Sequence, residues 1–178
     1  MKRLALLLLL CLSLPALANG LWFGPDGTPL TDSDSRQTKR GFSGALVITD
    51  DRDWALKLAN PGNGAPSIVQ ANEIGRGGQL AVLIFFANPK LDVARKADIR
   101  CDIRVLRPDG SVSADQKNLV CYQGPALGDE RHTYLSAPVV RFVAEPADQA
   151  GKWTVNVTLR DGARRVMVPL QSSFTLVD

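Results

Sequence analysis

The stretch EPADQAGKWTVNVTLRDG, from Glu145 to Gly162, contains the clearest alternation of apolar and polar residues in the chain. From Lys152 onward every second residue is apolar, which is typical of a β-strand with one buried face and one solvated face. Asp161-Gly162 then ends the alternation with a pair that favours a tight hairpin turn. The sequence therefore predicts a strand and a hairpin, followed by a returning strand over ARRVMVPL and SFTLVD.

Similar patterns predict strands in the preceding part of the chain. Thr133–Glu145 is expected to be interrupted at Pro138, because proline cannot donate a hydrogen bond to a neighbouring strand. Asp51–Asn60 favours a short helix capped by Asp51, with a strand as the alternative. The other expected strands are Phe42–Asp50, Gly77–Pro89, Ala97–Leu106 and a segment around NLVCYQG at 118–124. About seven strands and few helices predict an all-β, antiparallel β-sandwich, with a partly closed β-barrel as the alternative fold.

The segment DQAGKWTV at 148–155 resembles the corner before the penultimate strand of immunoglobulin-like and fibronectin-III-like domains of secreted bacterial proteins. The resemblance implies that Asp148, Gly151 and Trp153 build the corner. Asp148 would accept hydrogen bonds from turn amides, and Gly151 would supply a positive φ. Trp153 stands where those domains carry tyrosine. The resemblance implies a single immunoglobulin-like sandwich and indicates no particular activity.

The N-terminus has the pattern of a secretory signal peptide. Lys2 and Arg3 precede an apolar run of 11 residues, Leu4–Leu14, and small residues follow at Ala16–Ala18. We expect cleavage after Ala18, no membrane-spanning segment in the mature protein, and a periplasmic or secreted location. A flexible arm over residues 19–41, rich in Gly, Pro, Ser, Thr and Asp, would then precede a β-sandwich domain over residues 42–178.

Cleavage would change the charge and the cysteine count of the chain. The mature chain would have 160 residues with a net charge near +1 and no clustering of Lys and Arg, which argues against nucleic-acid binding. Cys11 would be lost, and the two remaining cysteines of an exported chain predict an intradomain disulfide, Cys101–Cys121. The alternative is two separate buried thiols. A hairpin folded about Ser111 would place Cys101 opposite Cys121 and Ile103 opposite Leu119.

The sequence shows no convincing catalytic, metal or cofactor site. The single histidine, His132, has no nucleophile motif beside it, so we expect a surface residue and no enzyme activity. The acidic residues near Asp50 and Asp32 do not have the spacing of a calcium loop. We therefore predict no metal ion and no cofactor.

One strand is expected to be apolar on both faces. Ala81, Leu83 and Phe85 would lie on its outer face, where a sandwich normally meets water, so something must cover them. The cover could be the segment around Trp54, the arm that carries Trp22 and Phe23, a second copy of the chain, or another protein. These six residues are the candidate interface.

Composition, compartment and patterning together suggest an exported, non-catalytic β-sandwich that acts by binding another protein of the cell envelope, or by self-association. Accessory, assembly and inhibitor or immunity roles all fit. The alternatives are a module that binds carbohydrate or another envelope ligand, and a hydrolase that uses His132.

Overall fold

The computed structural model describes residues 22–24, 27–60, 68–126 and 132–178. The expected signal peptide, residues 1–18, lies outside the described residues. Eleven elements follow one another along the chain: β1 (Arg36–Lys39), β2 (Phe42–Thr49), α1 (Trp54–Ala59), β3 (Glu73–Gly75), β4 (Gln79–Ala87), β5 (Lys96–Leu106), β6 (Val112–Pro125), β7 (Thr133–Leu135), β8 (Val140–Val143), β9 (Gly151–Asp161) and β10 (Val166–Val177).

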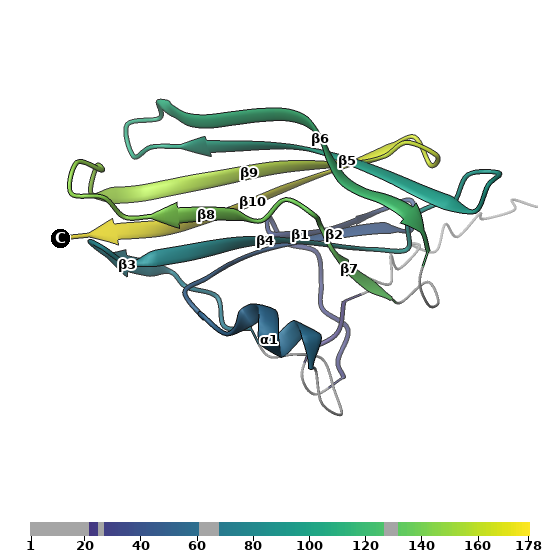
Figure 1. Cartoon of the computed structure of the whole chain (residues 1–178), viewed down its shortest axis with the longest axis horizontal. Helices are drawn as coiled ribbons and strands as arrows, with labels where there is room; N and C mark the ends of the chain where they lie inside the picture. Colours follow the sequence, from purple (N-terminus) through teal and green to yellow (C-terminus); the bar gives the residue numbers. More distant parts are fainter. Residues whose placement is uncertain (1–21, 25–26, 61–67, 127–131) are drawn as a thin grey trace, which may run out of the picture.

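The strands form two five-stranded sheets that pack face to face, which confirms the predicted sandwich and not the partly closed barrel (Figure 1). The first sheet has the order β1-β2-β4-β7, and β8 also pairs with β4. The second has the order β3-β10-β9-β5-β6. All pairs are antiparallel except β3 with β10. The fold is therefore an all-β, immunoglobulin-like sandwich with one disulfide. The single described helix, α1, has six residues, too few to span a membrane.

The core lies between the sheets and is made by the alternating apolar residues of the long strands. Its largest fully buried side chains include Trp153, Phe42, Phe86 and Phe174. The sheets come especially close at Gly44 on β2, where a Cβ atom would lie 2.7 Å from a methyl carbon of Leu159 on β9. Only glycine fits between the layers at this point without displacement of its neighbours.

Most predicted strands are present, and the differences occur in short or polar segments. Pro138 separates β7 from β8, as expected. Residues 51–60 contain the helix α1, but Asp51 does not cap it: the N-cap is Asp53, and Asp51 accepts a hydrogen bond from the Asp53 amide.

The arm expected over 19–41 contains β1, which pairs with β2 as an edge strand. Its sequence, RQTK, is polar, because an edge strand largely meets solvent.

Local hydrogen bonds hold the corner before β9. The Glu145 amide donates to the Asp148 carboxylate (2.9 Å), and Gly151 has a φ of +122°. The indole Nε1–H of Trp153 donates to the Gln149 carbonyl at 2.9 Å. The indole thus ties the strand back to its corner, although the tyrosine hydroxyl of related corners is missing. This bond anchors the start of β9 to the core.

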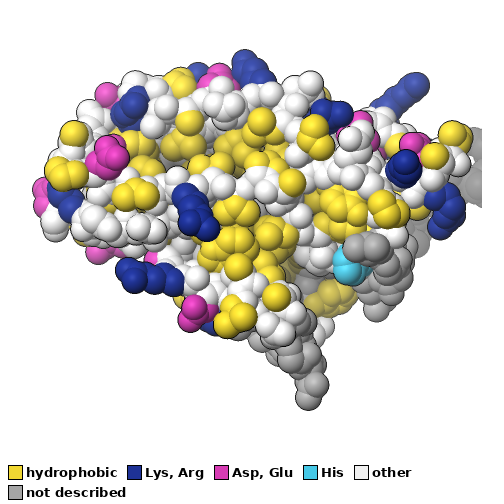
Figure 2. Space-filling model, in the orientation of Figure 1, with side chains coloured by type: hydrophobic (Ala, Val, Ile, Leu, Met, Phe, Trp, Pro, Cys, Tyr) yellow, Lys and Arg dark blue, Asp and Glu magenta, His cyan; other side chains and the backbone are white. Residues whose placement is uncertain are grey.

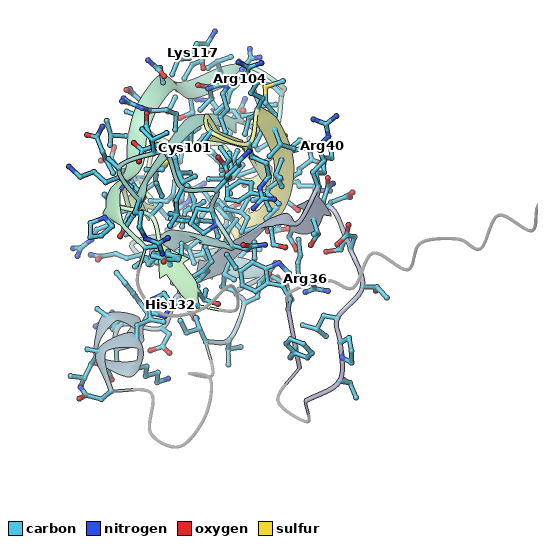
Figure 3. All side chains as sticks on the ribbon, turned by 90° about the vertical axis from the view of Figure 1, so that its right-hand side faces the viewer. Arg36, Arg40, Cys101, Arg104, Lys117 and His132 are labelled. Atoms are coloured by element: carbon cyan, nitrogen blue, oxygen red, sulfur yellow. A yellow bond between two sulfur atoms is a disulfide. The ribbon has the colours of Figure 1, made fainter. Side chains whose placement is uncertain are left out.

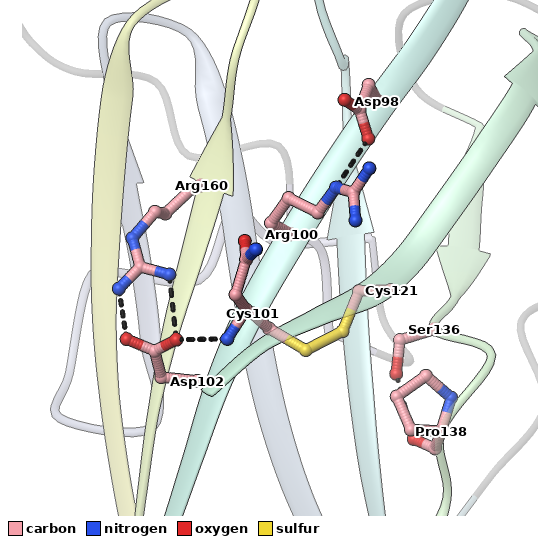
Figure 4. The surroundings of a disulfide bond; sticks show 9 residues. Asp98, Arg100, Cys101, Asp102, Cys121, Ser136, Pro138 and Arg160 are labelled. Atoms are coloured by element: carbon pink, nitrogen blue, oxygen red, sulfur yellow. Dashed lines mark hydrogen bonds and ion pairs between the residues drawn. A yellow bond between two sulfur atoms is a disulfide. The ribbon is translucent and has the colours of Figure 1, made fainter. Parts of the chain in front are cut away.

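The disulfide Cys101–Cys121 is formed, but the predicted register of its hairpin is wrong (Figure 4). Cys101 pairs with Leu119, and Ile103 pairs with Gln116. The turn lies at Pro108–Gly110, and three irregularities then each add one residue to β6. Cys121 is the extra residue of one such bulge, because its neighbours Val120 and Tyr122 pair with Arg100 and Ile99. The bulge turns the Cys121 side chain into the core, 5.8 Å from Cys101 between Cα atoms.

Asp102 holds the second bulge in place on the outer side of the hairpin. Its carboxylate accepts a hydrogen bond from the amide of Asn118, which has a φ of +54° (2.8 Å), and forms a two-pronged ion pair with Arg160 of β9 (Figure 4). The hydrogen bonds from Arg160 are the main reason that the pKa of Asp102 falls from 3.8 to about 2. One carboxylate therefore joins three strands.

This ion pair predicts a pH-dependent contribution to stability. The pKa of Asp102 is lower in the folded state, so the stabilisation is present above about pH 4 and is lost as the pH falls towards 2. We expect Asp102→Asn to lower the free energy of unfolding by about 1 kcal/mol at pH 7, after allowance for solvent screening, and by nothing measurable near pH 2. Urea unfolding of both proteins at the two pH values measures this. A difference that is independent of pH would contradict the ion pair as its source.

Candidate functional site

The outer face of the first sheet carries buried apolar residues, whereas the outer face of a simple sandwich meets water. Ala81 and Leu83 of β4 lie on this face and are 7% and 0% exposed, whereas Phe85 is partly exposed. The single chain itself therefore covers the centre of this face. Figure 1 shows α1 on this outer side, away from the second sheet.

Trp22 and Phe23 pair with residues 29 and 30. Phe23 forms an isolated β-bridge with Pro29, and the Leu30 amide donates to the Trp22 carbonyl at 2.8 Å. Phe23 remains 47% exposed, while the Nε1–H of Trp22 is buried without a hydrogen-bond partner in the described part of the chain. The two residues thus differ: Trp22 is tucked inward and Phe23 faces solvent.

None of the residues of the helix α1 is buried. Trp54 and Leu58 are partly exposed, and Leu56 is 64% exposed. Two further apolar side chains are exposed, Val143 on β8 and Val69 in the connection from α1 to β3. Figure 2 shows apolar side chains gathered in the band between β8 and α1. We call α1, Val69 and Val143 the helix-side surface.

A hollow of about 300 Å³ opens beside this surface, between α1 and the ends of β2, β4 and β8. Its apolar lining includes Trp54 and Ala81, which brings together two of the six predicted interface residues. Arg141 of β8 stands directly opposite Ala81 of β4 in the sheet register. The residues that line the hollow are Thr49, Asp50, Asp51, Arg52, Trp54, Gln79, Leu80, Ala81 and Arg141.

The charges around the hollow are only partly paired. Asp51 accepts a hydrogen bond from Lys57 Nζ at 2.5 Å, and this bond is the main reason that the pKa of Asp51 is lowered. Asp50, Arg52 and Arg141 make no hydrogen bond or ion pair through their side chains within the described residues. No sequence pattern connects these residues, because they come from three segments that only the sheet brings together.

His132 lies beside β7, on the side of the molecule that carries α1 (Figure 3). It is exposed, and its ring meets the edge of the Tyr134 ring at 4.7 Å between centroids. No carboxylate or serine hydroxyl bonds to it in the described part of the chain. Within the same residues no group of three or more His, Cys, Asp or Glu side chains is arranged to hold a metal ion.

Comparison with models of protein families and with curated protein sequences gives no match. Among solved structures, the CARDB domain of the PF1109 protein from Pyrococcus furiosus is 11% identical with a TM-score of 0.38, covering 83% of this chain and 99% of that chain. The C-terminal domain of wzt is 12% identical with a TM-score of 0.39, covering 83% and 80%. A family 123 glycoside hydrolase from Clostridium perfringens is 7% identical with a TM-score of 0.42.

The match to the hydrolase covers 76% of this chain and 27% of that chain, so this chain spans about a quarter of the enzyme's length. At these identities the likeness concerns the fold alone. With TM-scores below 0.5, none of these likenesses supports a conclusion about the role of this chain.

Proposed function

We propose that this chain is a non-catalytic binding protein of the periplasm or cell envelope, and that it acts by binding another protein. The proposed compartment rests on the signal-peptide pattern of residues 1–18 and is supported by the disulfide, since disulfides persist in oxidising compartments. Accessory, assembly and inhibitor roles all remain within this proposal.

The observation that carries the proposal is the helix-side surface. A helix of six residues is not stable alone, and helices in proteins gain most of their stability from burying an apolar face. α1 buries none of its residues and instead presents Leu56 to solvent, and apolar side chains gather between α1 and β8 (Figure 2). Grouped apolar side chains of this kind mark protein interaction sites. A partner that covers α1 would supply the burial that the helix lacks.

Site-specific photo-crosslinking tests the proposal. A photo-reactive phenylalanine analogue in place of Leu56 is expected to give one discrete heavier adduct in cells, recovered from the periplasmic fraction. The matched control places the analogue at Met167, which is similarly exposed (58% against 64%) but belongs to β10 in the second sheet. We expect little or no adduct there. The mass of the adduct distinguishes another protein from a second copy of this chain.

Two results would contradict the proposal. One is the same set of weak adducts from both positions, which would show that exposure alone determines crosslinking. The other is recovery of the protein from the cytoplasm with its N-terminus uncleaved, which would remove the envelope as the place of action. Leu56→Asp should abolish stable association with the partner that the crosslink identifies, while Met167→Asp should leave it intact.

A further inference from the structure

The hollow beside α1 is lined by both apolar and charged residues. Its lining combines apolar residues, among them Trp54 and Ala81, with planar polar side chains from three segments. The indole Nε1–H of Trp54 has no hydrogen-bond acceptor among the described residues. Trp54 thus brings an aromatic side chain with an unused donor to the lining of the hollow.

The polar rim has hydrogen-bonding capacity that the protein itself does not use. The carboxylate of Asp50 can only accept, the guanidinium groups of Arg52 and Arg141 can only donate, and the amide of Gln79 can do both. None of these four side chains has a hydrogen-bond or ion-pair partner in the part of the chain that the structure describes. An occupant of the hollow would meet donors and acceptors at once.

The free charges of the lining residues are of both signs. Asp51 pairs with Lys57, which leaves one free carboxylate, Asp50, and two free guanidinium groups, Arg52 and Arg141, in the lining. A purely anionic occupant would therefore meet a carboxylate as well as the guanidinium groups. A purely apolar occupant would remove the free charged groups from water without pairing them, which is costly. The lining favours an occupant that is neutral overall, polar at its edge and apolar on one face.

We propose that this hollow binds a neutral saccharide, either a single sugar or one residue of a glycan. A pyranose ring has a C–H face that can stack on an indole, and its edge carries hydroxyl groups that both donate and accept hydrogen bonds. Trp54 would supply the stacking face, while Asp50, Gln79 and Arg141 would bind hydroxyl groups. A volume of about 300 Å³ is at the lower end of small-ligand pockets and fits a ligand of this size.

This inference does not depend on the protein partner proposed above. The protein-binding surface is defined by the exposed Leu56, which does not line the hollow, whereas the saccharide site is defined by Arg141 and Gln79, which do. An experiment can therefore contradict one of the two proposed sites and leave the other standing. Leu56→Asp is expected to leave saccharide binding unchanged while it abolishes the protein contact.

The test is titration of the protein purified from cells expressing the full chain with glucose, galactose, mannose and N-acetylglucosamine. Ligand-observed NMR and tryptophan fluorescence would follow binding. We expect at least one of these neutral sugars to bind with a dissociation constant on the order of 1 mM, as ligand size allows. Trp54→Ala and Arg141→Ala should each weaken binding at least about tenfold.

The matched control is Arg104→Ala. Arg104 is an exposed arginine without a hydrogen-bond partner in the described residues, and it lies on the opposite side of the molecule (Figure 3). Its removal should not change the affinity. The inference is overturned if none of the four sugars binds, if Arg141→Ala binds as well as the unmodified protein, or if acetate and N-acetylneuraminic acid compete better than any neutral sugar.

Discussion

Trp153→Ala is expected to lower the free energy of unfolding by about 3–5 kcal/mol, the largest loss at any single position considered for this chain. The indole is 1% exposed and packs against the rings of Phe142 and Phe174, with centroid distances of 4.9 and 6.2 Å. Truncation would leave a large cavity between the sheets and remove the hydrogen bond to Gln149. Urea unfolding followed by circular dichroism measures the loss.

Trp153→Phe is the control for this prediction. The phenyl ring keeps most of the apolar contact but cannot donate to the Gln149 carbonyl, so we expect a smaller loss, about 1–2 kcal/mol. If the alanine and phenylalanine variants were equally stable, the packing of the indole would not be the source of the effect. A loss below about 1 kcal/mol in the alanine variant would place Trp153 outside the cooperative core.

Removal of the disulfide is expected to have the second-largest effect. The bond joins residues that are 20 positions apart, and closure of such a loop restricts the unfolded chain by about 3 kcal/mol in the chain-entropy description. We therefore expect the double variant Cys101→Ala, Cys121→Ala to unfold at a clearly lower urea concentration at neutral pH. The unmodified protein should approach the same midpoint when dithiothreitol is added.

The reductant is also the control for packing. The double variant loses two buried sulfur atoms as well as the bond, whereas reduction breaks the bond and keeps both sulfurs. Dithiothreitol should not change the midpoint of the double variant. Mass analysis of protein recovered from the periplasm should find both thiols oxidised, and free thiols in that sample would contradict a structural role for the bond.

The long strands and the disulfide could be predicted from the sequence because both depend on local patterns. Alternation over residues 152–160 identified the buried face of β9, and the predicted signal peptide together with the cysteine count led to the prediction of Cys101–Cys121. The register of β5 with β6 could not be predicted, since alternation defines the faces of a strand and does not reveal extra residues in it. The three-residue strand β3 is too short for any periodicity to appear.

The candidate site was only partly accessible to the same reasoning. The sequence predicted Trp54 and Ala81 as candidate interface residues, and the structure brings both to one hollow. Arg52, Gln79 and Arg141 gave no signal, because nothing in their sequence neighbourhoods separates them from ordinary solvated residues. Burial of Leu83 is likewise a tertiary property: it depends on which segments return across the outer face of β4.

The bulges of β6 have a consequence for how this protein meets other chains. An edge strand with 14 regular residues would offer a straight row of backbone donors and acceptors, which is a template for addition of a foreign strand and for open-ended aggregation. Three extra residues break that row, and the Ala137 amide already occupies the Cys121 carbonyl at 2.8 Å. The same irregularity that turns Cys121 into the core therefore protects the exposed margin of the sheet against fibril-like stacking.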